Sequence, residues 1–322
     1  MTTAAIAQVT DGAVDLLGAG YPIALPTETV YGLAADATNV TAVLRIFQCK
    51  ERPLFDPLIV HLPTIEWLDK LTSIPVEDRP LVEKLIGHFW PGPLTLVLPR
   101  HSSVPDVVTA GLETVAVRMS AHPLFQQILT AFGKPLAAPS ANRFGRISPT
   151  CAADVKEELD GRIHLIVDGG QTKHGIESTI VLIKKGKMFI LRSGPVTADD
   201  LRKHGTVTNI GSGMKPLAPG QLKSHYAPRT PMELLPPDAH PWWEGEGKAG
   251  LLAWCSADDV GGFRNVEILS PSGSLHEAAA TLFQKLRRLD NFGLDRIVAE
   301  SVPEVGIGVA IMDRLRKAAA HG

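Results

Sequence analysis

"TIVLIKKGKMFILRSG", residues 179–194, decides the fold class, because it contains two apolar runs of strand character separated by a glycine turn. The turn, residues 184–187, is too short for a crossover connection, so the two strands must run antiparallel. Elsewhere strand patterns alternate with helical patterns, which is typical of sheets that contain parallel pairs. The sequence therefore predicts an α/β fold with a mixed sheet.

The chain before this hairpin carries further strand and helix patterns in alternation. Short apolar runs predict strands at residues 22–25, 57–62, 93–99, 115–120, 135–142 and 163–170. Apolar residues at helical spacing predict helices at residues 9–20, 39–50, 122–133 and 151–161. Asn39 is expected to cap the second of these helices.

The composition of the chain changes near residue 205. A stretch rich in glycine and proline follows, without apolar periodicity, and it predicts a linker. Beyond the linker a smaller α/β unit is expected, with strands at 249–254, 265–269 and 296–301 and helices at 274–290 and 308–320. The 322 residues are therefore divided into a first domain (1–205), the linker (206–231) and a small α/β domain (232–322).

Composition and charge exclude several classes of protein. Hydrophobic residues make up 44% of the chain and charged residues 20%, as in proteins that bury a core. The formal net charge is −2, so no overall positive field attracts nucleic acid or an anionic membrane. The three cysteines lie far apart, which argues against a disulfide scaffold or a zinc ribbon. With no basic residue before Arg45 and no apolar run of bilayer length, we expect a cytoplasmic protein.

Two cations, Lys50 and Arg52, stand two positions apart just before an apolar strand. A helix end favours basic residues, and that alone accounts for Lys50. Arg52 precedes a proline, which favours extended backbone, and side chains two apart on extended backbone share a side. The pair therefore fits either a solvated helix end or an anion site such as a phosphate chain.

Several other residues are unusual for their position. Arg118 stands within an apolar strand and Arg192 at the end of another, and a buried arginine needs a partner. Ser140, Asn142, Ser178 and Thr29 each alone are more often ordinary turn residues, but all lie near strand ends, where open α/β sheets bind ligands. His61 by itself fits a core histidine. The chain carries no P-loop motif and no nucleophile elbow, so any nucleotide is held in another way.

Seven motifs occur in order: "PTETVYGL", "KERPLFDPLIVH", "FWPGPLTLVL", "VAVRMS", "PSAN", "GIEST" and "LRSGP". Together they closely resemble the threonylcarbamoyl-AMP synthase family of the YrdC type, over residues 8–200, and the rest resembles its long two-domain form. The resemblance implies a twisted α/β sheet with a concave face and a small Rossmann-like domain. It also implies an enzyme, a nucleotidyltransferase that joins L-threonine, bicarbonate and ATP into threonylcarbamoyl-AMP with release of pyrophosphate, for threonylcarbamoyladenosine in tRNA.

The resemblance also assigns residues to the site. The threonine pocket falls on Thr29, His61, Arg118, the Ala138 backbone and Ser178. The ATP site falls on Lys50, Arg52, Asp56, Thr114, Ser140, Asn142, Ser148, Arg192 and Tyr226, with Lys50 and Arg52 as the catalytic cations. Asp56 departs from the family, because relatives often carry asparagine there and an acid repels phosphate. Mg²⁺ is expected to be held through the ATP phosphates and not by a protein metal site.

The expected partners are the three substrates and a downstream threonylcarbamoyl transferase complex, with no stable nucleic-acid binding and no membrane. Two alternatives remain open from the residues: an RNA-binding module with a basic concave face, and a carbamoyl-transferring relative that uses another acceptor. The linker, residues 206–231, is expected to act as a lid that brings Tyr226 over the nucleotide.

Overall fold

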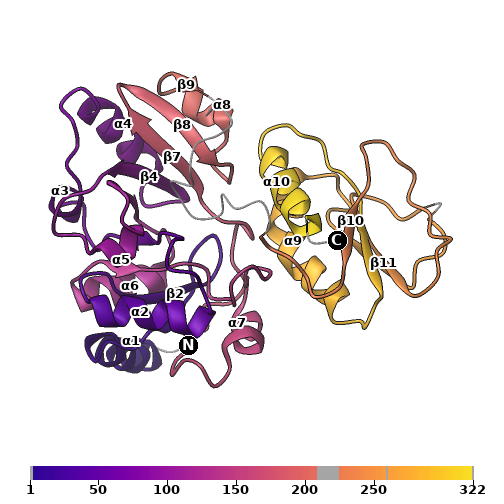
Figure 1. The fold of residues 1–322 in the computed structure, drawn as a ribbon, viewed down its shortest axis with the longest axis horizontal. Coiled ribbons are helices and arrows are strands. Elements are labelled where there is room, and N and C mark those ends of the chain that lie inside the picture. Colours follow the sequence, from indigo (N-terminus) through magenta and orange to yellow (C-terminus); the bar gives the residue numbers. More distant parts are fainter. Residues whose placement is uncertain (1–2, 209–224, 259, 321–322) are drawn as a thin grey trace.

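The computed structural model describes residues 3–208, 225–258 and 260–320, which form a larger and a smaller lobe (Figure 1). Most of the predicted linker, residues 209–224, lies outside the described residues, and so does the greater part of the predicted lid. His225 and Tyr226, which follow it directly, belong to the described part.

The larger lobe is built on a nine-stranded sheet of order β1-β2-β6-β3-β5-β4-β7-β8-β9. Its strands are β1 (Ile23–Leu25), β2 (Gly32–Asp36), β3 (Ile59–His61), β4 (Leu94–Pro99), β5 (Thr114–Arg118), β6 (Leu136–Ala137), β7 (Thr179–Lys184), β8 (Lys187–Arg192) and β9 (Val207–Thr208). The β7–β8 hairpin is antiparallel, whereas β3 pairs with β5 and β4 with β7 in parallel. The predicted mixed sheet is confirmed.

The helices of this lobe cover the sheet. They are α1 (Thr3–Gly18), α2 (Val40–Lys50), α3 (Trp67–Leu71), α4 (Arg79–Phe89), α5 (Asp106–Thr109), α6 (Pro123–Phe132), α7 (Ala152–Leu159) and α8 (Ala198–Arg202). The predicted cap of α2 is confirmed, because the Asn39 side chain accepts a hydrogen bond from the Ala42 amide. The predicted strand at 163–170 is wrong. Within it, only Ile166 forms a bridge, to Ala24 of β1.

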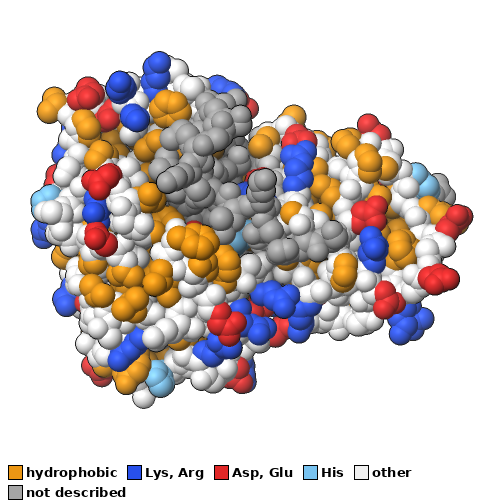
Figure 2. All heavy atoms as spheres, viewed as in Figure 1, with side chains coloured by type: hydrophobic (Ala, Val, Ile, Leu, Met, Phe, Trp, Pro, Cys, Tyr) orange, Lys and Arg blue, Asp and Glu red, His pale blue; other side chains and the backbone are white. Residues whose placement is uncertain are grey.

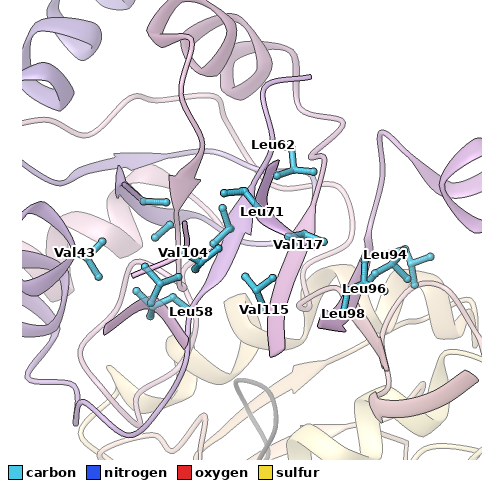
Figure 3. Close-up of a cluster of buried hydrophobic side chains, with 14 of the residues drawn as sticks. Val43, Leu58, Leu62, Leu71, Leu94, Leu96, Leu98, Val104, Val115 and Val117 are labelled. Carbon is cyan, nitrogen blue, oxygen red and sulfur yellow. The ribbon is translucent and has the colours of Figure 1, made fainter. Parts of the chain in front are cut away.

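The core of the larger lobe follows the period of two that strands impose. Leu94, Leu96 and Leu98 of β4 share one face with Val115 and Val117 of the neighbouring β5 (Figure 3). A second cluster covers the opposite face of β3, β4, β5 and β7, and it consists of Ile59, Val97, Ala116, Ile180 and Leu182. A third cluster joins α1 and α6 to β1 and β2. Both faces of the central strands are therefore buried, and a polar side chain among them needs a partner within the protein.

The smaller lobe is a four-stranded parallel sheet of order β10-β13-β11-β12. Its strands are β10 (Met232–Leu234), β11 (Ala249–Ala253), β12 (Asn265–Ile268) and β13 (Arg296–Ala299), and its helices are α9 (Leu275–Asp290) and α10 (Gly308–Ala319). The predicted second α/β unit is confirmed. The sequence missed β10, whose three residues are too few to show a period.

Helices α9 and α10 are the elements of the smaller lobe that face the larger one (Figure 1). Val30, Ile147 and Ile176 of the larger lobe belong to the same buried apolar cluster as residues of these two helices. Charged contacts surround the cluster: Arg287 of α9 bonds Glu158 at 3.1 Å, and Figure 2 shows basic and acidic side chains where the lobes meet. One apolar cluster therefore joins the two lobes.

Candidate functional site

A cavity lies where several strand ends of the large sheet meet. β3 and β5 run parallel and place His61 opposite Arg118 at their carboxyl ends, and β7 begins beside them. Nine residues predicted for the site line this cavity: Thr29, Arg52, His61, Arg118, Ala138, Ser140, Ser178, Arg192 and Tyr226. Residues far apart in the sequence are thus brought together by the sheet topology.

Arg118 is held on three sides at the end of β5. Its guanidinium forms an ion pair with Glu28 at 2.7 Å and donates hydrogen bonds to Thr29 Oγ1 and the Gly92 carbonyl, both at 3.1 Å. Burial favours the neutral carboxylic acid, but the charge of Arg118 and the hydrogen bonds from Ser120 and Arg118 together outweigh it and lower the pKa of Glu28 to about 2. The arginine is fixed in orientation with its charge at the cavity wall.

His61 is buried next to this ion pair and packs on Phe125, with ring centroids 4.7 Å apart. Burial, together with the positive charge of Arg118, lowers the pKa of His61 to about 3. The imidazole is therefore neutral near pH 7, and it is a polar group of the cavity wall without a net charge.

This buried histidine predicts an acid-sensitive stability. In the unfolded chain a histidine binds its proton near pH 6.5, whereas folded His61 does so only near pH 3. The unfolded state therefore gains a proton first as the pH falls, and the free energy of unfolding should decrease by about 1.4 kcal/mol per pH unit from this side chain. We expect His61→Gln to reduce the measured slope by that amount between pH 6.5 and 4.5.

Urea unfolding at intervals across this window measures the slope. The window lies above the range in which Glu28 matters, since stability from its lowered pKa is lost only below about pH 4.5. Half-buried His174 and buried His225 also have lowered pKa values and remain in the variant, so some slope should persist. An unchanged slope in His61→Gln would contradict the prediction.

Arg192 and Ser178 form a second fixed pair on the cavity wall. Arg192 Nη2 donates to Ser178 Oγ and Nε donates to the Ser178 carbonyl, both at 3.0 Å. The Ser178 hydroxyl also lies 2.8 Å from the Thr95 hydroxyl. These contacts keep the start of β7 and the end of β8 in one arrangement.

Lys50 and Arg52 both lie in the buried region next to the cavity, but the expected extended geometry between them is wrong. Glu51 ends α2 in the left-handed region, with φ 55°. Lys50 and Arg52 therefore do not stand on one side of an extended segment. The ammonium of Lys50, 1% exposed, donates to the carbonyls of Ser140 and Asn142. Lys50 thus ties α2 to the loop after β6, whereas Arg52 lines the cavity itself.

Arg52 is balanced by Asp56, the residue that departs from the family pattern. The two side chains form a buried ion pair at 2.8 Å, and Arg52 also donates to the carbonyls of Asp56 and Pro57. Asp56 therefore neutralises Arg52 in the described structure. Asp56 is not among the residues that line the cavity, and it holds the guanidinium in place.

Three other predicted residues lie away from the cavity lining. Asn142 Nδ2 donates to the carbonyls of Arg143 and Arg146 and so holds its own loop. Ser148 donates to Glu177 at 2.5 Å. Thr114 begins β5 and pairs with Pro99, whereas Arg118 ends the same strand. Thr114 is thus at the end of β5 that lies opposite to the cavity.

Sequence reasoning missed three ionisable residues in and next to the cavity: Glu28, Glu177 and His225. Glu177 and His225 line the cavity, and Glu28 pairs with Arg118 just behind it. Glu28 and Glu177 stand inside the quoted motifs "PTETVYGL" and "GIEST", next to the predicted Thr29 and Ser178. Arginines predicted to be buried need acidic partners, and an acidic residue next to a predicted site residue was the signal that could have identified these two.

The chain matches known families and proteins over nearly its whole length. Residues 15–194 match the family of Sua5, YciO and YrdC, described as telomere recombination, and residues 195–320 match the C-terminal domain of threonylcarbamoyl-AMP synthase. The chain is 39% identical to the threonylcarbamoyl-AMP synthases of Bacillus subtilis and Pyrococcus abyssi, with 95% and 94% of this chain and 92% and 91% of those proteins covered.

A solved structure shares the fold. The crystal structure of P. abyssi Sua5 complexed with L-threonine is similar to this chain with a TM-score of 0.86 and 36% sequence identity. The similarity covers 98% of this chain and 95% of that one. The order of motifs, the two-lobed fold and these similarities agree, and the chain belongs to the threonylcarbamoyl-AMP synthase family in its two-domain form.

Proposed function

We propose that this protein is an L-threonylcarbamoyladenylate synthase, which condenses L-threonine, bicarbonate and ATP into threonylcarbamoyl-AMP, pyrophosphate and water for tRNA modification. One observation supports this best: three arginines, Arg52, Arg118 and Arg192, line a single cavity. Separate cations suit a reaction that brings a carboxylate and a triphosphate together. The family membership supports the same activity.

In this proposal the threonine carboxylate binds Arg118. Glu28, Thr29 and Gly92 fix the guanidinium, so its planar fork is oriented before the substrate arrives. Neutral His61, the Ala138 backbone and Ser178 complete the pocket. Because Glu28 partly cancels the charge of Arg118, binding depends on geometry as much as on net charge.

ATP would occupy the side of the cavity that holds Arg52, Arg192, Ser140 and Tyr226. Attack on the α-phosphate builds negative charge on phosphate oxygens and on the departing pyrophosphate, and fixed guanidinium groups stabilise that charge without rearranging. Lys50 acts through the loop that carries Ser140 and Asn142, which its ammonium holds. We assign no general base, and proximity in the cavity drives carbamate formation.

The residues near the cavity fit a magnesium ion held by the nucleotide and not one held by the protein. Glu28, Asp56 and Glu177 are each paired with an arginine, and no group of three potential metal ligands occurs among the described residues. Such an ion supplies charge neutralisation for the triphosphate when bound. The protein side chains supply the positioning.

The direct test is pyrophosphate release from ATP with single omissions. Release should require L-threonine, bicarbonate and Mg²⁺ together, because adenylation needs the carbamate formed from the first two. D-threonine or L-valine serves as a matched control for the pocket. Equal release without threonine would reject the proposal and favour a relative that acts on another acceptor.

The remaining parts of the proposal concern partners. The product should pass to a threonylcarbamoyl transferase complex in the cytoplasm. No helix of the described residues has the length and apolar character to cross a bilayer.

An RNA-binding module is the rival class of protein. Filter binding of RNA over a salt series distinguishes the two, since tight and salt-steep RNA binding without pyrophosphate release would favour that module.

A further inference from the structure

Arg314, in helix α10 of the smaller lobe, has an unusual set of neighbours. Its side chain is 1% exposed, although arginine is almost never fully buried without partners. One contact is within α10, an ion pair with Asp313 at 3.0 Å, and three others lead to separate parts of the cavity wall. None of the sequence motifs drew attention to it.

The first contact is with Glu177, which lines the cavity. Arg314 Nε lies 3.1 Å from Glu177 Oε2, while Ser148 donates to the other oxygen of the same carboxylate. Burial would raise the pKa of Glu177, but Arg314 and Arg192 outweigh it and keep the group ionised. Glu177 directly precedes Ser178, so the pair fixes the loop that carries the Ser178 hydroxyl.

The second contact reaches the residue after Arg192. Arg314 Nη1 donates to the carbonyl of Ser193 at 2.7 Å. Arg192 in turn bonds Ser178. One guanidinium from α10 therefore holds both strand ends whose side chains meet in the cavity wall.

The third contact is with Tyr226. The guanidinium carbon of Arg314 lies 5.4 Å from the centre of the Tyr226 ring, and the ring also stacks on Phe283 of α9 at 5.5 Å. Tyr226 has a φ of 65°, a left-handed conformation that costs free energy in a non-glycine residue and persists where surrounding contacts impose it. Arg314 and Phe283 contact its ring, as does His225 at 4.2 Å, and the next amide, that of Ala227, bonds the Gly145 carbonyl.

The backbone next to Glu177 is packed against the same lobe. A side chain at Gly175, which has a φ of 68°, would place its Cβ 2.3 Å from the Ala280 carbonyl oxygen of α9. Ile176 is buried in the apolar cluster that α9 and α10 form. The loop over 175–178 is thus seated on the smaller lobe and has little freedom of its own.

We propose that Arg314 is a positioning residue for the nucleotide side of the active site, acting through Glu177, Ser193 and Tyr226. The inference rests on the proposed function, in which Arg192 and Tyr226 face ATP. It gives the smaller lobe a specific role: α10 carries the arginine that sets the mutual arrangement of Ser178, Arg192 and Tyr226. Arg118 and His61 lie outside these contacts.

Arg314→Lys tests this role, because lysine keeps the charge and loses the planar fork that reaches three partners. The KM for ATP should rise at least fivefold. The KM for threonine should rise by a smaller factor, because Ser178 is the one residue of the threonine pocket among these contacts. The Kd of a non-hydrolysable ATP analogue, measured by calorimetry, should rise to the same degree. A lower folded fraction would reduce kcat and leave both KM values unchanged. A change in the KM for ATP therefore distinguishes a positioning role from an effect on folding.

Arg287→Lys is the matched control. Arg287 is also a buried arginine of the smaller lobe that bonds the larger lobe, through Glu158 and the Ile147 carbonyl, but it does not touch the cavity neighbours of Arg314. Its KM values should stay within twofold of wild type. Equal effects in the two variants would overturn the proposal, as would an effect of Arg314→Lys on kcat alone.

Glu177→Gln probes the same link from the larger lobe and should also raise the KM for ATP selectively. If Arg314→Lys and Glu177→Gln both fail to fold while Arg287→Lys folds, Arg314 serves folding alone and the proposal is wrong. Wild-type protein is measured alongside. Absence of threonine-dependent pyrophosphate release in the wild type would reject the proposed function, and the ATP-analogue Kd would still report on Arg314.

Discussion

Arg118→Ala should lower the free energy of unfolding by about 3–5 kcal/mol and remove saturation by threonine. The stability loss follows because Glu28 would remain buried and ionised without its partner. The loss of saturation follows from the missing fork for the substrate carboxylate. Urea unfolding measures the first effect, and pyrophosphate release against threonine concentration measures the second.

Two further variants separate stability from substrate binding at this position. In Arg118→Met with Glu28→Gln both charges are gone, so stability should largely recover while threonine use stays lost. Arg118→Lys retains a charge opposite Glu28 and should raise the KM for threonine more than the KM for ATP. If Arg118→Lys left threonine dependence unchanged, Arg118 would be structural or would serve the phosphates.

Arg52→Ala should lower turnover by about 10²–10³-fold, the effect typical of removing one preorganised donor to a transition-state charge. It should also destabilise the fold, since Asp56 would be left buried without its ion-pair partner at 2.8 Å. Steady-state pyrophosphate release and urea unfolding on the same preparation measure the two losses separately.

A double variant distinguishes the two roles of Arg52. Arg52→Ala with Asp56→Ala removes both charges, and we expect stability to recover while turnover stays low. Asp56→Asn keeps Arg52 and should retain turnover within about tenfold of wild type, because the guanidinium still donates to the Pro57 carbonyl. If the double variant regained turnover, Arg52 would have no role in stabilising phosphate charge.

The strand ends of the site were accessible from the sequence because strand patterns are local. The apolar runs at 57–62 and 115–120 identified β3 and β5, and their last residues, His61 and Arg118, stand opposite each other. The prediction was wrong at Lys50 and Arg52, where Pro53 suggested extended backbone. The left-handed turn at Glu51 is set by the C-cap of α2, where its amide bonds Gln48.

The sequence by itself determined the mixed sheet, the second α/β unit and the residue types gathered at the strand ends, because periodicity and turn chemistry act over a few residues. Only the tertiary structure decided which charges neutralise each other: Glu28 with Arg118, and Glu177 with Arg314, which are 137 positions apart. Such pairs form because burial makes an unpaired charge costly. Which partner satisfies the charge depends on how α10 packs against the loop before β7, and no local pattern encodes that contact.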